Sequence, residues 1–209
     1  MLVLPPAGQV PMPPLAALAM AAAMIPPPAL APSVYVTSNY ALTFRSPPGA
    51  FYCPLPDDWV GSDHGTTLLL IQPTACGEVG YPSSGRAFTP ESTPRIEVYY
   101  GYWDAEDALA PGPCRQVGTA SLMGGDQPLC RTDAEGFVVV KVTAHYEADI
   151  PAELDLTLVT TPARLARDLA AFRAMAGTAR ACAAAWKDDN GRPFTLGHGA
   201  PCPEDGRTF

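Results

Sequence analysis

The stretch FVVVKVTAHYEADIPAELDLTLVTT, residues 137–161, decides the fold because apolar and polar residues alternate along it in two runs. Period-two alternation is typical of strands that bury one face. In the first run, 137–147, one face carries Val138, Val140, Val142, Ala144 and Tyr146, and the other carries Lys141, Thr143 and His145. In the second run, 153–161, the inward residues are Leu154, Leu156 and Leu158. Residues 147–153 suit a hairpin connection, so the two runs are predicted to pair antiparallel.

A long helix is predicted to follow this hairpin. Pro162 suits a first helical turn because its φ is fixed, and Thr161 is the expected N-cap. Apolar residues then recur at helical spacing as far as Lys187, before DDNG (188–191) ends the helix. This stripe comprises Leu165, Leu169, Phe172, Ala176, Ala179 and Trp186. Arg164, Arg167 and Asp168 lie off the stripe and are expected in solvent.

Further strands are predicted upstream, at residues 34–37, 40–45, 66–73 and 95–103. The last of these, RIEVYYGYW, places Ile96, Val98, Tyr100 and Tyr102 on one face. Residues 74–94 and 104–136 are long segments for which no strand is predicted. The expected fold is therefore α+β, with an antiparallel β-sheet packed against one long C-terminal α-helix.

The chain divides into three predicted parts, with residues 1–33 as leader, 34–187 as a single α+β domain and 188–209 as a Gly/Pro-rich tail. The first 44 residues carry no charge and hold nine prolines, and LAALAMAAAMI (15–25) has the length of a signal-peptide apolar region. ALA (29–31) offers small residues for cleavage. No basic residue precedes the apolar run, and a disordered Ala/Pro-rich leader is the alternative.

Six cysteines indicate disulfides formed in an oxidising compartment. They are even in number, widely spread and without the C-x-x-C spacing of zinc or redox sites. Six cysteines allow 15 connectivities. We favour the sequential pairing Cys53–Cys76, Cys114–Cys130 and Cys182–Cys202, which also joins the tail to the domain. The protein is therefore expected to be periplasmic or secreted.

The composition disfavours several classes of partner. Charged residues make up 16% of the chain and the net charge is -8, so attraction to nucleic-acid phosphates or anionic lipid is unfavourable. The apolar run of the leader is too short to span a bilayer, and no stable membrane insertion of the mature chain is expected.

Two quoted stretches resemble a known family. LPDDW (55–59), which follows an N-terminal hairpin, and LDLTLVTTPARLARDLAAFRAMAGTAR (154–180) are similar to elements of the PsbP-like α/β-sandwich superfamily. The resemblance covers about residues 35–60 and 137–186. It implies a non-enzymatic accessory or partner-binding domain, and it supplies no site residue. The six cysteines and the middle of the chain depart from that pattern.

No sequence motif for catalysis, metal or cofactor binding stands out. Ser62, Asp63 and His64 are adjacent, whereas a catalytic triad must converge from separate parts of a fold. Turn hydrogen bonds explain Asp57, Asp58, Ser62 and Asp63 more simply. His64, His145 and His198 lack metal-ligand spacing, and the segment GGDQP is no phosphate loop. No cofactor or metal is expected.

The candidate binding residues are Tyr99, Trp103, Arg86 and His64. Tyr99 and Trp103 lie opposite the apolar face of their strand, where exposed aromatic residues favour interfaces. The expected function is a non-catalytic binding domain for a protein partner, in an accessory, inhibitor or immunity-type role. Two alternatives stay open: a periplasmic hydrolase-type enzyme with its site near Asp58, Asp63, His64 and Arg86, and a small-ligand or carbohydrate binder that uses Tyr99 and Trp103.

Overall fold

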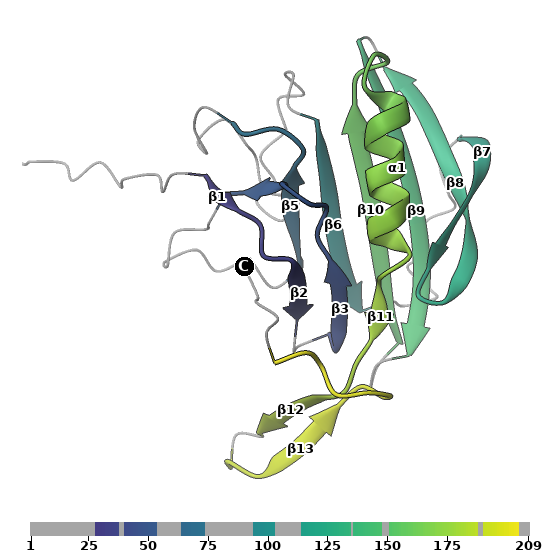
Figure 1. Cartoon of the computed structure of the whole chain (residues 1–209). Helices are drawn as coiled ribbons and strands as arrows, with labels where there is room; N and C mark the ends of the chain where they lie inside the picture. Colours follow the sequence, from purple (N-terminus) through teal and green to yellow (C-terminus); the bar gives the residue numbers. More distant parts are fainter. Residues whose placement is uncertain are drawn as a thin grey trace, which may run out of the picture.

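The computed structural model describes residues 28–37, 40–53, 64–73, 94–102, 114–134, 136–147, 151–187 and 190–204 (Figure 1). Its main feature is an eight-stranded sheet in the order β1–β4–β5–β6–β10–β9–β8–β7, in which all neighbouring strands are antiparallel. These strands are β1 Ala29–Leu30, β4 Phe51–Tyr52, β5 Gly65–Leu69, β6 Arg95–Tyr102, β7 Arg115–Leu122, β8 Gly125–Ala134, β9 Phe137–Glu147 and β10 Pro151–Thr160. The expected antiparallel α+β fold is confirmed.

The alternating stretch forms the predicted hairpin at the centre of this sheet. β9 pairs with β10 from Glu147 opposite Pro151 to Val138 opposite Thr160. β6 pairs along the other side of β10, with Leu154 opposite Tyr100. The alternating side chains of all three strands therefore share one face, and those apolar side chains on it whose burial the structure describes are buried. Residues 148–150 of the predicted connection lie outside the described residues.

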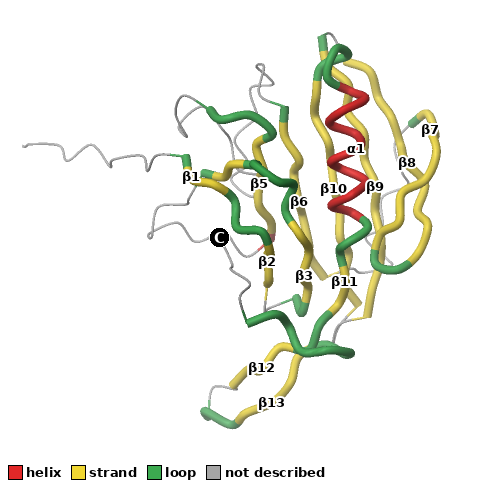
Figure 2. The backbone as a smooth tube through the Cα atoms, in the orientation of Figure 1, coloured by secondary structure: helices red, strands yellow, loops and turns green. Residues whose placement is uncertain are grey.

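One layer covers the apolar face of the sheet. Helix α1, Leu165–Ala176, lies over β10 and β9, and a small sheet in the order β11–β3–β2 lies over β5 and β6 (Figures 1 and 2). The strands of this small sheet are β2 Val34–Thr37, β3 Leu42–Arg45 and β11 Arg180–Ala181. Phe172 of α1 and Tyr35 of β2 are fully buried, and each such side chain contributes about 2–3 kcal/mol of burial free energy. The Tyr35 and Tyr100 hydroxyls meet at 2.6 Å and join the two layers within the core.

The predicted helix is too long. α1 ends at Ala176, and residues expected to continue it form β11 and β12, the latter spanning Ala184–Lys187. Beyond the Gly177–Thr178 turn, Ala181 pairs with Leu42 and the Cys182 N–H donates to the Ala41 carbonyl at 2.7 Å. The backbone of these residues thus forms hydrogen bonds with β3 that a continued helix could not form. The free energy of this pairing outweighs the helix propensity of the alanines.

The start of the helix also differs from the prediction. Arg164, not Thr161, occupies the N-cap position, and no side chain caps the helix. Asp168, expected in solvent, is buried with 2% of its surface exposed. Thr160 donates to one of its carboxylate oxygens at 2.5 Å, and Arg164 binds both oxygens. The i,i+4 spacing of Arg164 and Asp168 is indistinguishable in sequence from a solvated surface pair.

A hairpin occupies most of the segment 104–136, for which no strand was predicted. β7 and β8 are joined by a two-residue loop at Met123 and Gly124, whose φ angles of 53° and 80° are both positive. Two positive φ angles are the mark of a type I′ turn, which favours glycine. The hairpin forms one edge of the sheet (Figure 1).

The two ends of the described chain add smaller features. In the predicted tail, β13, Pro193–Leu196, pairs with β12 to form a hairpin that projects from one end of the sheet (Figure 2). Ala29 and Leu30, which lie in the predicted leader, form β1 and pair with Tyr52 and Phe51. The predicted strands 34–37, 95–103 and 137–147 match β2, β6 and β9 to within a residue, whereas those at 40–45 and 66–73 are shortened to β3 and β5.

Candidate functional site

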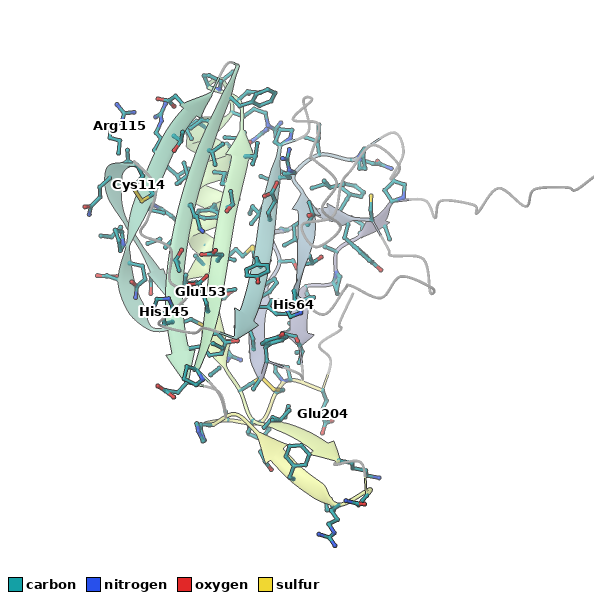
Figure 3. All side chains as sticks on the ribbon, turned by 180° about the vertical axis from the view of Figure 1, so that it is seen from behind. His64, Cys114, Arg115, His145, Glu153 and Glu204 are labelled. Atoms are coloured by element: carbon teal, nitrogen blue, oxygen red, sulfur yellow. A yellow bond between two sulfur atoms is a disulfide. The ribbon has the colours of Figure 1, made fainter. Side chains whose placement is uncertain are left out.

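The face of the sheet opposite α1 is the best candidate for a functional surface. We call it the open face and define it by the outward side chains of β6, β9 and β10: Glu97, Tyr99, Lys141, Thr143, His145, Glu153, Asp155 and Thr157. Figure 3 views this side of the sheet, with α1 behind the strands. Because side chains alternate along a strand, the pattern that builds the core also gathers these polar groups on the opposite side.

Register places an acidic group at the centre of the open face. Asp155 lies opposite Thr143 on β9 and opposite Tyr99 on β6. Its Oδ2 forms an ion pair with Lys141 Nζ at 2.6 Å, and its Oδ1 accepts a hydrogen bond from the Thr143 hydroxyl. Both carboxylate oxygens of Asp155 are therefore engaged within the protein.

A second cross-strand pair lies beside the first. His145 Nε2 is 2.9 Å from Glu153 Oε2, and the two residues are direct register partners on β9 and β10 (Figure 3). Such exposed pairs contribute at most about 1 kcal/mol to stability. Their consequence for binding is that Lys141 and His145 already have acidic partners within the protein.

Tyr99 and His64 form an aromatic pair at the β5 side of the open face. Tyr99 is 43% exposed, and its ring stacks on the His64 ring at a centroid distance of 6.3 Å. Hydrogen bonds to buried residues orient the His64 ring, since its Nδ1 lies 2.9 Å from the Tyr40 hydroxyl and 3.4 Å from the Tyr100 carbonyl oxygen. A carbonyl only accepts, so this arrangement favours the tautomer with hydrogen on Nδ1.

The close approach of β5 to β6 explains how this pair is positioned. Gly65 follows His64 and lies opposite Tyr99, and a side chain at Gly65 would meet the Val98 carbonyl oxygen at 2.1 Å. Only glycine lets the backbone of β5 come this close to β6. The glycine therefore brings the His64 ring against Tyr99.

The structure brings together two of the four predicted binding residues. Tyr99 and His64 meet, whereas Trp103 and Arg86 lie outside the described residues. Asp58 and Asp63, which the enzyme alternative requires, also lie outside them. His64 itself is exposed.

Sequence reasoning missed a cleft on the β7–β8 side of the open face. It lies where hairpin β7–β8 meets β9 and β10 and has a volume of about 820 Å³. The described residues that line it are Cys114, Gln116, Gln127, Pro128, Cys130, Thr132, Val139, Lys141, Thr143, Ala144, His145 and Thr157. The alternation in β9 placed Lys141, Thr143 and His145 on the polar face, but the lining residues from β7 and β8 could not be placed because that hairpin was not predicted.

Disulfide bonds hold both the cleft and the tail. Cys114–Cys130 ties the residue before β7 to β8, and Cys182–Cys202 ties the end of β11 to the tail, so two of the three predicted pairings are confirmed. Cys53 is also disulfide-bonded, but its predicted partner Cys76 lies outside the described residues. Disulfides of this number favour an oxidising compartment outside the cytoplasm.

The described residues include no candidate metal site and no candidate membrane-spanning helix. No cluster of three or more His, Cys, Asp or Glu in that part of the chain could hold a metal ion. No helix within it is long and apolar enough to span a membrane.

Fold and site together define a class, a disulfide-bonded antiparallel sheet with one helical layer and an open polar face. Comparison with family models, curated proteins and solved structures found no match to this chain. The resemblance to the PsbP-like superfamily therefore stays a prediction from short motifs.

Proposed function

We propose that this chain is a periplasmic or secreted, non-catalytic binding domain that docks a protein partner on its open face. The observation that carries the proposal is Tyr99, which is 43% exposed, whereas Tyr100 and Tyr146 on the other face of the sheet are buried. Tyrosine is enriched at protein interfaces because it buries a large apolar ring while its hydroxyl keeps a polar contact.

The surroundings of Tyr99 support docking of a protein. Its ring stacks on His64, and its hydroxyl end lies over Gly101 of the same strand, where a side chain would meet it at 3.0 Å. A rigid aromatic side chain on a strand loses little conformational entropy when it is buried, which is the usual property of an interface hot spot. The ion pairs Lys141–Asp155 and His145–Glu153 supply hydrogen-bonding groups around it without an unbalanced charge that docking would have to desolvate.

The test is capture of partners from an extracytoplasmic extract of the native host with the oxidised protein as bait. Tyr99→Ala is the test variant. Phe194→Ala is the matched control, because Phe194 is a similarly exposed aromatic residue, 41% against 43%, on the separate β12–β13 hairpin. We expect the wild type and the Phe194 variant to retain one specific protein that the Tyr99 variant loses by at least about tenfold, as for a typical hot spot.

Two results would contradict this proposal. Equal retention of the specific protein by all three baits would show that Tyr99 does not contribute to docking. Loss of the specific protein from the Phe194→Ala bait alone would show that the interface lies on the β12–β13 hairpin.

A further inference from the structure

A row of register partners on four strands crosses the cleft under hairpin β7–β8. Gln116 on β7 lies opposite Cys130 on β8, Cys130 opposite Lys141 on β9, and Lys141 opposite Thr157 on β10. All four residues line the cleft. Four strands thus contribute side chains to one wall, held in place by the sheet and by the Cys114–Cys130 disulfide.

The size of the cleft suits a small molecule. Its volume of about 820 Å³ falls within the roughly 300–1,000 Å³ that is usual for small-molecule sites. Because its walls are strands of a single sheet joined by a disulfide, the site is largely preformed. A preformed site spends little binding energy on ordering its own residues.

The polar groups that remain free in the cleft are neutral. In the described part of the chain, the side chains of Gln116, Gln127, Thr132 and Thr157 have no protein hydrogen-bond partner. Each of these amides and hydroxyls can both donate and accept. A ligand that presents hydroxyl groups, which also donate and accept, therefore matches them best.

The charged groups of the cleft are already balanced. Lys141 pairs with Asp155, and His145 with Glu153. The described lining contains no aspartate or glutamate of its own. An anionic ligand would have to displace these internal carboxylates, and a cationic ligand would find no free one, so both would lose hydration without full compensation.

The same wall also offers an apolar surface. Val139, Pro128 and the Cys114–Cys130 disulfide lie among the polar lining residues. A pyranose ring needs both kinds of contact, since its hydroxyls lie around the rim and its C–H groups form an apolar face. We propose that this cleft is a second binding site, which shares Lys141, Thr143, His145 and Thr157 with the open face but does not include Tyr99, and that it takes a neutral saccharide.

The experiment uses the oxidised full chain alone, so its outcome does not depend on any protein partner. Amide chemical shifts are followed by NMR during titration with glucose, N-acetylglucosamine and their β-1,4-linked disaccharides. Glucuronic acid and glucosamine serve as charged counterparts of nearly the same shape. We expect the neutral sugars to perturb amides of β7, β8 and β9 around the cleft, and each charged sugar to bind more weakly.

The variant Gln116→Ala/Thr132→Val tests the polar wall. Both residues are exposed, and the threonine change keeps the side-chain shape, so the fold is expected to persist. The affinity for the neutral sugar should fall about tenfold, as expected when one or two hydrogen bonds to a ligand are lost. Thr119→Val, an exposed change on β7 outside the cleft, is the control and should leave the affinity unchanged.

Three outcomes would overturn the proposal: no shift perturbation by any neutral sugar at millimolar concentration, tighter binding of a charged sugar, or equal affinity of the double variant and the wild type. The partner-capture result for Tyr99→Ala bears on none of these, so failure of one proposal is distinguishable from failure of the other.

Discussion

At the scale of single residues, Asp168 has the sequence spacing of a surface residue but is buried and joins two elements of the fold. Its carboxylate lies between the end of β10 and the first turn of α1, where it accepts hydrogen bonds from Thr160, Arg164 and Arg167. Arg164 also reaches the Leu70 carbonyl oxygen at 3.4 Å. The cluster therefore joins the helix start to both β10 and the end of β5.

Replacing Asp168 by asparagine should lower the free energy of unfolding by about 3 kcal/mol, because it leaves the Arg164 guanidinium without its anionic partner in a largely buried site. Urea denaturation followed by circular dichroism measures this change as a lower midpoint at constant slope.

Asp133→Asn is the matched control for this substitution. Asp133 pairs with Arg131 and Arg115, but its side chain is 53% exposed, so its loss should cost less than about 1 kcal/mol. Equal costs for the two substitutions would contradict the anchoring role of Asp168.

The end of α1 is decided at the scale of elements, by contacts that local sequence does not contain. Thr178 follows the helix, and its hydroxyl donates to the Met175 carbonyl at 2.6 Å while it accepts the Arg45 N–H at 2.8 Å. The first bond closes the last turn of the helix, and the second connects it to the end of β3. Residues 180–181 then enter the small sheet beside β3.

Thr178→Val should therefore cost about 1–2 kcal/mol, since it keeps the side-chain shape but removes both hydrogen bonds. Native-state hydrogen exchange offers a local readout, because the Arg45 amide should lose protection. Thr119→Val, on exposed β7, should change neither quantity. Unchanged protection of Arg45 in the Thr178 variant would contradict this account of helix termination.

At the scale of the whole molecule, the alternation in residues 137–161 was enough to predict the central hairpin, its buried face and the antiparallel sheet. The alternation in residues 95–103 placed Tyr99 on the face opposite the core, where it is exposed. The sequence left 15 cysteine connectivities open, and the favoured sequential one is confirmed for Cys114–Cys130 and Cys182–Cys202.

The parts that could not be predicted depend on contacts between distant segments. The β7–β8 hairpin has few alternating apolar residues, and of those whose burial the structure describes only Ala120, Leu122 and Leu129 are buried. Its cleft also depends on the register of four strands. His64 stacks on Tyr99 because β5 approaches β6 closely at Gly65. A single glycine in the sequence does not predict such an approach.

The most direct test of the central claim, that the open face docks a protein, is covalent side-chain footprinting of the oxidised protein with and without its captured partner. Aromatic side chains are labelled in proportion to their exposure, and Tyr99 and Phe194 start from nearly equal values of 43% and 41%. We predict that the partner strongly reduces labelling of Tyr99 and leaves Phe194 unchanged. Unchanged labelling of Tyr99 in the saturated complex would contradict the claim.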